Sequence, residues 1–170
     1  MRDRRFRYGA GLVLLVVSIC VIALAACVPT LGDPPVRPVG IGLSGDGQLR
    51  FVVALCPGEQ LASFEVTDHS NEQLIWKVSQ PIGAMRQGGE VVLGDSSGFA
   101  TIVMKLSPSV PENIDATARL TDDFTFGSAF LRNGIPKDIA GTDYVLDRNK
   151  QKVSAQEFVR QIRSEYCRSR

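Results

Sequence analysis

The sequence predicts a mainly β domain, an antiparallel β-sandwich with one α-helix at its C-terminal end. Three observations predict this fold class. Apolar and polar residues alternate in short runs through the middle of the chain, turn-forming residues separate these runs, and a helical spacing of apolar residues is confined to the end. Short strands separated by frequent turns are typical of sandwiches and barrels.

The first part of the chain predicts export. Arginines dominate the first eight residues, and residues 9–26 carry no charge and are strongly apolar. A positive start, an apolar run and small residues at its end describe a secretory signal peptide. The length of the run would also suit a retained membrane-spanning helix. We interpret residues 1–26 as a removed signal because of the four residues at the junction, residues 24–27.

The segment Leu24-Ala25-Ala26-Cys27 resembles the lipobox of bacterial lipoproteins. Small side chains give a peptidase access to the backbone, and the Cys27 thiol can carry a diacylglyceryl thioether. Burying lipid chains gains about 0.8 kcal/mol per methylene, and two chains anchor a protein stably. We therefore expect Cys27 to be the lipidated N-terminus of a lipoprotein on the extracytoplasmic side of the cell membrane.

Residues 27–38 contain four prolines and predict an extended tether that precedes the folded domain, residues 39–170. Without the signal, 144 residues remain, which suits one domain with a proper core. These residues hold 15 basic and 17 acidic side chains. A net charge of −2 does not favour a nucleic-acid binder, which would present a basic surface.

The strands are predicted in order along the chain. Val39, Ile41 and Leu43 alternate with small residues, and an Asp46-Gly47 turn leads into the alternating run 49–55, which predicts a hairpin. Further runs occupy residues 64–66, 74–78, 91–93, 99–106, 114–120 and 124–130. We expect seven to nine strands with Trp76 facing the core. On strand count we favour an immunoglobulin-like sandwich, although no Cys-Trp-Cys signature is present.

The C-terminal segment predicts one amphipathic helix, residues 155–167. Ser154 and Glu157 form a capping-box pattern, and Phe158, Ile162 and Tyr166 recur every four residues. We expect the apolar face to dock on the sandwich. The basic excess of residues 148–170, 7 against 2, would then lie on an acidic body; a surface-binding tail is the alternative.

The cysteines predict one disulfide. Cys20 leaves with the signal and Cys27 is lipidated, so Cys56 and Cys167 remain. Two leftover thiols outside the cytoplasm usually pair. With one histidine and no Cys-x-x-Cys, the sequence predicts no metal site and no cofactor.

The mature domain resembles exported lipoproteins of actinobacteria. Three short motifs carry the resemblance: Leu-Cys-Pro-Gly at 55–58, Leu-Ile-Trp-Lys at 74–77, and Glu-Phe-Val-Arg at 157–160 followed by Tyr-Cys at 166–167. The resemblance implies the sandwich and the disulfide. It implies no activity.

Catalytic patterns are weak. Residues 94–98 match Gly-x-Ser-x-Gly, but a nucleophile elbow needs a following helix, and the next run predicts a strand. We interpret Ser96 as a turn residue and do not pair it with His69. Asp122-Asp123 and the Asp143/Asp147 pair lack the spacing of a calcium loop.

The functional hypothesis is a membrane-anchored, non-enzymatic binding module for an envelope protein or a cell-wall component. An envelope hydrolase with an unrecognised carboxylate pair is an alternative, because two such acids need only meet in space. A structural subunit of a membrane complex is another. No catalytic residue is assigned, and the binding residues are left open.

Overall fold

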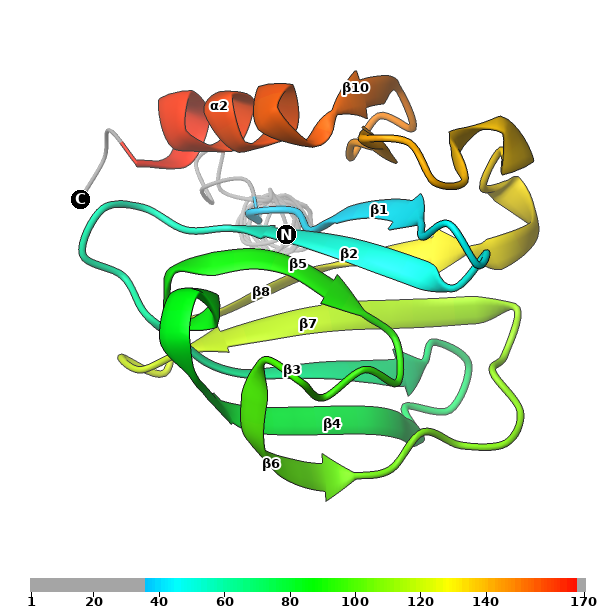
Figure 1. The fold of residues 1–170 in the computed structure, drawn as a ribbon, viewed down its shortest axis with the longest axis horizontal. Helices are drawn as coiled ribbons and strands as arrows, with labels where there is room; N and C mark the ends of the chain where they lie inside the picture. Colours follow the sequence, from blue (N-terminus) through cyan, green and yellow to red (C-terminus); the bar gives the residue numbers. More distant parts are fainter. Residues whose placement is uncertain (1–35, 168–170) are drawn as a thin grey trace, which may run out of the picture. The chain divides into compact units, whose positions relative to one another are not determined.

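The computed structural model describes residues 36–167. Two five-stranded antiparallel sheets form a sandwich, and a C-terminal helix covers the outer face of one of them (Figure 1). The mainly β fold class with one C-terminal helix is confirmed, and the immunoglobulin-like assignment stays a prediction. The predicted signal peptide, Cys27 and the first part of the predicted tether lie outside the described residues.

The sheet under the helix, here the covered sheet, has the strand order β10-β9-β1-β2-β5. Its strands are β1 (Gly40–Leu43), β2 (Leu49–Ala54), β5 (Gly88–Val92), β9 (Tyr144–Leu146) and β10 (Lys152–Ser154). The other sheet, here the open sheet, has the order β6-β4-β3-β7-β8. Its strands are β3 (Leu61–Asp68), β4 (Leu74–Pro81), β6 (Phe99–Met104), β7 (Asn113–Leu120) and β8 (Thr125–Leu131). Three short 3-10 helices, η1 (Gly83–Gln87), η2 (Arg132–Gly134) and η3 (Lys137–Ile139), lie in the connections.

Strand β2 shows how the alternation builds three layers. All six of its residues are buried. Phe51 and Val53 belong to the core between the sheets, whereas Val52 and Ala54 belong to the cluster under the helix. Trp76 is 1% exposed within the core between the sheets, as predicted from the sequence.

The C-terminal helix, α2 (Ala155–Tyr166), docks as predicted, with Phe158 and Ile162 buried. The Phe158 ring lies 3.2 Å from the place where a Cβ on Gly40 would stand, so β1 and α2 approach closely because position 40 has no side chain. Only half of the predicted capping box forms. Ser154 Oγ accepts from the Glu157 N–H at 3.1 Å, but the Glu157 carboxylate accepts from Arg160 and Gln161 instead.

The structure describes ten strands where seven to nine were expected, and the folded domain begins before residue 39. Strands β9 and β10 were not predicted, and they carry the chain from the sandwich to α2. Arg37 and Pro38, which were expected in the tether, are buried, and the compact unit begins at Val36.

Candidate functional site

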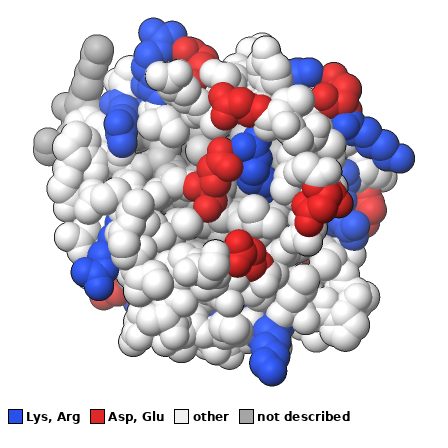
Figure 2. Space-filling view, viewed as in Figure 1, with Lys and Arg blue, Asp and Glu red and all other residues white. Residues whose placement is uncertain are grey.

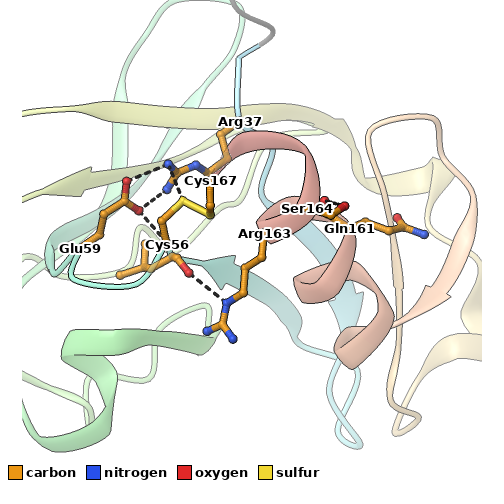
Figure 3. Close-up of a disulfide and its surroundings, with 8 residues drawn as sticks. Arg37, Cys56, Glu59, Gln161, Arg163, Ser164 and Cys167 are labelled. Carbon is orange, nitrogen blue, oxygen red and sulfur yellow. Dashed lines mark hydrogen bonds and ion pairs between the residues drawn. A yellow bond between two sulfur atoms is a disulfide. The ribbon is translucent and has the colours of Figure 1, made fainter. Parts of the chain in front are cut away.

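The predicted disulfide is present and lies beside a buried ion pair (Figure 3). Cys56, just after β2, is bonded to Cys167 at the end of α2, 111 residues away. Arg37 donates to both carboxylate oxygens of Glu59, at 2.5 and 2.9 Å, and Glu59 also accepts from the Cys56 N–H at 2.8 Å. Arg37 and Glu59 are only 3% and 10% exposed, so this pair fixes the start of the domain to the disulfide.

Further contacts of this corner are also structural. The Arg37 guanidinium lies over the Phe126 ring, 4.7 Å from its centre, and Nη2 reaches Cys56 Sγ at 3.4 Å. Arg163 donates from Nε to the Leu55 carbonyl at 3.2 Å. Apart from Arg37 Nε, which has no hydrogen-bond partner among the described residues, the polar groups named here hold three segments together, and the sulfurs of Cys56 and Cys167 form the disulfide.

The structure gives no partner set for catalysis by Ser96. Ser96 lies in the turn between β5 and β6, so its context is strand–turn–strand, as predicted. His69 lies in the β3–β4 turn, and its Nδ1 is 2.9 Å from an oxygen of Asp115 on β7. The two residues are not brought together by any contact among residues 36–167.

Three of the four acidic residues singled out in the sequence, Asp122, Asp123 and Asp147, have side chains engaged by nearby groups. Asp123 pairs with Arg119 at 2.8 Å. Asp147 Oδ1 accepts from the N–H groups of Asn149 and Gln151, both at 2.8 Å. In the described part of the chain, no group of three His, Cys, Asp or Glu residues is placed to hold a metal ion.

Three carboxylates also line a shallow hollow on the outer face of the open sheet: Glu65, Glu72 and Asp115. Two of them have cationic or histidine partners. Glu65 pairs with Lys77 at 2.7 Å, and Asp115 contacts His69. The Glu65 carboxylate therefore pairs with a side chain of a neighbouring strand, and the Asp115 carboxylate with a side chain of a neighbouring turn. Charged pairs on a sheet face ordinarily have this stabilising role.

One concavity is a cleft at one end of the sandwich, here the end cleft, with a volume of about 810 Å³. The β1–β2 turn, the β5–β6 turn, the β6–β7 connection and the segment after β8 meet there (Figure 1). Its apolar lining consists of Leu43, Leu49, Leu93, Leu106, Val110 and Ile135. A volume of this size lies within the usual range for binding sites, about 300–1,000 Å³.

The rim of the end cleft is polar. Arg132 Nη1 donates to the Val110 carbonyl at 2.5 Å, and Glu112 accepts from the Asn133 N–H at 2.7 Å. Among residues 36–167, neither Arg132 nor Lys137 has a carboxylate within ion-pair distance. The lining itself carries two positive side chains, Arg132 and Lys137, and one negative side chain, Glu112.

The β1–β2 turn at this rim is held by Asp46. Its carboxylate accepts from the Ser44 hydroxyl at 2.5 Å and from the Gln48 amide at 2.7 Å. The hydrogen bond from Ser44 lowers the pKa of Asp46 from its usual value, so the ionised form is favoured in the fold. This turn is consequently preorganised beside the cleft.

Apolar surface continues from the end cleft along the edge strand β6. Leu106, which lines the cleft, is 39% exposed, and Ile102, Val103 and Met104 on β6 are also exposed. Figure 2 shows few charged side chains over the region of β4 and β6, and more over the region of α2 and β1. Contiguous exposed apolar surface of this kind marks an interaction site more often than single exposed residues do.

The sequence carries a partial signal for this cleft that its interpretation missed. Leu43, Leu49, Leu93 and Leu106 each stand at the end of an apolar run next to a turn. Such residues can close the end of the core or line a concavity above it. Only the assembled sandwich distinguishes the two, because the lining comes from segments far apart in the chain.

Among the described residues, no helix combines the length and apolarity that crossing a bilayer requires. Comparisons of the chain with protein-family models, with curated proteins and with solved structures find no match.

Proposed function

We propose that this protein is a lipid-anchored, non-enzymatic binding module of the cell envelope, whose end cleft receives an apolar segment of an envelope protein. The observation that carries the proposal is the end cleft itself, an aliphatic concavity bordered by polar groups. Concave apolar sites with a few placed polar groups are the usual form of binding sites. The exposed apolar strand β6 beside it supplies further contact area.

The chemistry of the lining favours a protein partner over a cell-wall polymer. The apolar lining is aliphatic, and no aromatic ring is among the lining residues, which are all within the described chain. Sugar units of a polymer carry many hydroxyl groups, and each one buried without a hydrogen-bond partner would cost free energy. Leucine, isoleucine or valine side chains of a partner would instead gain about 1.5–3 kcal/mol each on full burial.

The rim suggests the charge of the partner. Arg132 and Lys137 lack carboxylate partners within the described chain, so an acidic residue beside the apolar segment would complement them. Complementary rim charges contribute mainly to the association rate and to specificity. We therefore expect a partner segment with aliphatic side chains flanked by at least one Asp or Glu.

The proposed lipid anchor rests on the sequence pattern at Leu24–Cys27. The Arg37–Glu59 ion pair lies where the proposed tether joins the folded domain. A buried ion pair next to the disulfide gives the proposed tether a firm attachment. The binding module would then be held at the bilayer through lipid on Cys27.

The proposal is tested with the full-length, tagged protein purified in mild detergent from its own cells. Leu106→Glu places a charge in the end cleft, and Ile82→Glu is the matched control, since Ile82 is 46% exposed and lies outside the cleft. We expect a co-purifying envelope protein with the wild type and with Ile82→Glu, and its loss with Leu106→Glu at an unchanged melting temperature. Equal recovery with both variants would exclude the end cleft as the binding site.

A further inference from the structure

The two sulfurs of the Cys56–Cys167 disulfide lie in different electrostatic surroundings (Figure 3). Arg37 Nη2 donates to Cys56 Sγ at 3.4 Å. A guanidinium beside a sulfur favours the thiolate over the thiol, because the negative charge then lies next to a cation. Cys56 is therefore the sulfur that would carry negative charge more easily if the bond between the two cysteines opened.

The charged side chains in contact with the Cys56 region add up to a positive charge. Glu59 is the acidic one, and it already accepts two hydrogen bonds from Arg37 and one from the Cys56 N–H. Arg163 of α2 supplies a second cation, since its Nε donates to the carbonyl of Leu55, the residue before Cys56, at 3.2 Å. Among residues 36–167, Arg163 has no carboxylate within ion-pair distance. Two cations and one anion thus lie at this cysteine.

Cys167 has the opposite setting. It is the C-cap of α2, and its N–H donates to the Arg163 carbonyl at 3.3 Å. The C-terminal end of a helix carries partial negative charge, which destabilises a thiolate there. Glu165, two residues earlier, is acidic and pairs with Arg148 at 3.3 Å. When the disulfide is cleaved, the electron pair of the S–S bond is therefore expected to stay on Cys56.

The surrounding structure does not depend on the covalent bond alone. Phe158 and Ile162 hold α2 on the covered sheet and are 1% and 3% exposed. The Arg37–Glu59 ion pair includes neither sulfur. Opening of the disulfide would therefore leave both cysteines close together on a folded domain, where the bond can form again.

We propose that this disulfide is a thiol-exchange site for a dithiol, such as that of a Cys-x-x-Cys protein, with Cys167 forming the mixed disulfide and Cys56 acting as the leaving and resolving thiol. Both cysteines are half-buried, so the bond is not sealed within the core. The site is separate from the end cleft, since neither cysteine is among the residues that line the cleft.

The exchange has two steps. In the first, one thiolate of the dithiol attacks Cys167 Sγ; a bond forms between these sulfurs, the bond to Cys56 breaks, and Cys56 leaves as a thiolate beside Arg37. In the second, the other thiolate of the dithiol attacks the dithiol sulfur of the mixed disulfide and releases Cys167. The dithiol loses two electrons and two protons and becomes a disulfide. This protein gains the two electrons, Cys167 takes up one proton from water, and the other proton stays in solution.

The placement of Cys56 distinguishes a dithiol from a monothiol. In the mixed disulfide, Cys56 remains next to Cys167, so its thiolate can attack Cys167 Sγ again and expel a monothiol. A dithiol competes with this return step, because its second thiolate is held equally close to the mixed disulfide. Complete reduction is therefore expected from a dithiol and not from a monothiol at the same thiol concentration.

The first test locates the mixed disulfide in the full-length protein, purified in mild detergent. The protein is treated with glutathione, quenched with acid, alkylated and digested for peptide mass spectrometry. We expect glutathione on Cys167 to exceed glutathione on Cys56 about tenfold. Arg163→Gln should lower this ratio about threefold, and Arg160→Gln, which changes an arginine paired with Glu157, should leave it unchanged. Equal labelling of the two cysteines, an excess on Cys56, or the same ratio in both variants would overturn the proposal.

The second test asks whether the wild-type domain stays folded when the bond opens. Dithiothreitol should reduce the disulfide while the fluorescence of buried Trp76 and the slow amide exchange of α2 around Phe158 persist. Glutathione at the same thiol concentration should leave most of the disulfide intact. Unfolding that accompanies reduction, or reduction by glutathione as complete as that by dithiothreitol, would overturn the proposal.

Discussion

Arg37 is the residue on which the start of the domain depends. Its side chain is 3% exposed and donates to both carboxylate oxygens of Glu59. Its removal takes both hydrogen bonds from a mostly buried carboxylate, whereas the hydrogen bond from the Cys56 N–H stays. Breaking a buried ion pair by removing one partner costs about 3–5 kcal/mol. We expect Arg37→Ala to lower the free energy of unfolding by about that amount, measured by urea denaturation.

The control for Arg37 is Arg119→Ala. Arg119 pairs with Asp123 on the surface, and the two side chains are 52% and 80% exposed. An exposed pair of this kind contributes about 0–1 kcal/mol. Equal losses of stability in the two variants would show that the buried pair is no more important than a surface pair.

Four exposed carboxyl groups predict acid sensitivity. Hydrogen bonds from Ser44, Ser70, Lys152 and Arg160 lower the pKa values of Asp46, Asp68, Asp138 and Glu157, respectively. A pKa lowered by folding stabilises the protein above the pKa of the unfolded chain, and this contribution is lost as the pH falls through the folded value. We expect the urea midpoint to fall between about pH 5 and about pH 2, and Asp138→Asn to make the fall shallower. A midpoint that is constant over this range would contradict the expectation.

At the residue scale, the sequence predicts apolar burial better than charged burial. Trp76, Phe158 and Ile162 were assigned correctly because each belongs to a periodic pattern. The buried arginines Arg37 and Arg50 were not, because their partners Glu59 and Glu90 lie 22 and 40 residues away in the chain. No local pattern distinguishes such a pair from two solvated charges.

Helix α2 depends on Phe158 for its docking. The side chain is 1% exposed, lies against Gly40 and belongs to the cluster with Val52, Ala54 and Val145. Truncating a fully buried phenylalanine costs about 3–5 kcal/mol. We expect Phe158→Ala to lower the free energy of unfolding by this amount, with Ser164→Ala on the exposed face changing it by less than about 0.5 kcal/mol. An unchanged melting temperature for Phe158→Ala, together with weaker binding to anionic liposomes, would identify α2 as a membrane contact instead.

The disulfide acts on the same element. A link that closes a loop of this length stabilises a fold by about 4–5 kcal/mol in the chain-entropy model. It joins Cys167, the C-cap of α2, to Cys56, two residues after β2, so the helix is fixed at its C-terminal end as well as along its apolar face.

Element prediction succeeded where a pattern extends over several residues. Strands β1 to β8 have alternation or flanking turns, and α2 has an N-cap and an apolar stripe. Strands β9 and β10 have three residues each, too few for a period of two to be recognised. They become strands because β9 pairs with β1 at Ile41 and β10 pairs with β9, which is a tertiary cause.

The whole molecule is expected to be held at the membrane through Cys27. The pattern Leu24-Ala25-Ala26-Cys27 predicts both the cleavage site and the lipid attachment. Cells that produce Cys27→Ala should lose the mature membrane-bound form, because neither lipid attachment nor cleavage before position 27 can occur. Fractionation and intact-mass measurement of both proteins check this, and a Cys27→Ala chain that is still cut before position 27 and stays in the membrane would contradict it.

At this scale the sequence predicts location and layers but not the binding surfaces. The end cleft is lined by residues from four segments that lie far apart in the chain. Alternation identifies which residues belong to strands. It does not determine which strand lies at an edge or which run ends line a cleft.

Site-specific photo-crosslinking in intact cells tests the proposed binding module most directly. A photoreactive amino acid would replace Leu106 or Lys137 in the end cleft, and Ile82 or Thr117 outside it. We expect one envelope protein to be crosslinked from both cleft positions and from neither control position, with the attached peptide rich in aliphatic residues next to an Asp or Glu. Crosslinks to that protein from all four positions, or none from the cleft positions, would contradict a binding module that acts through the end cleft.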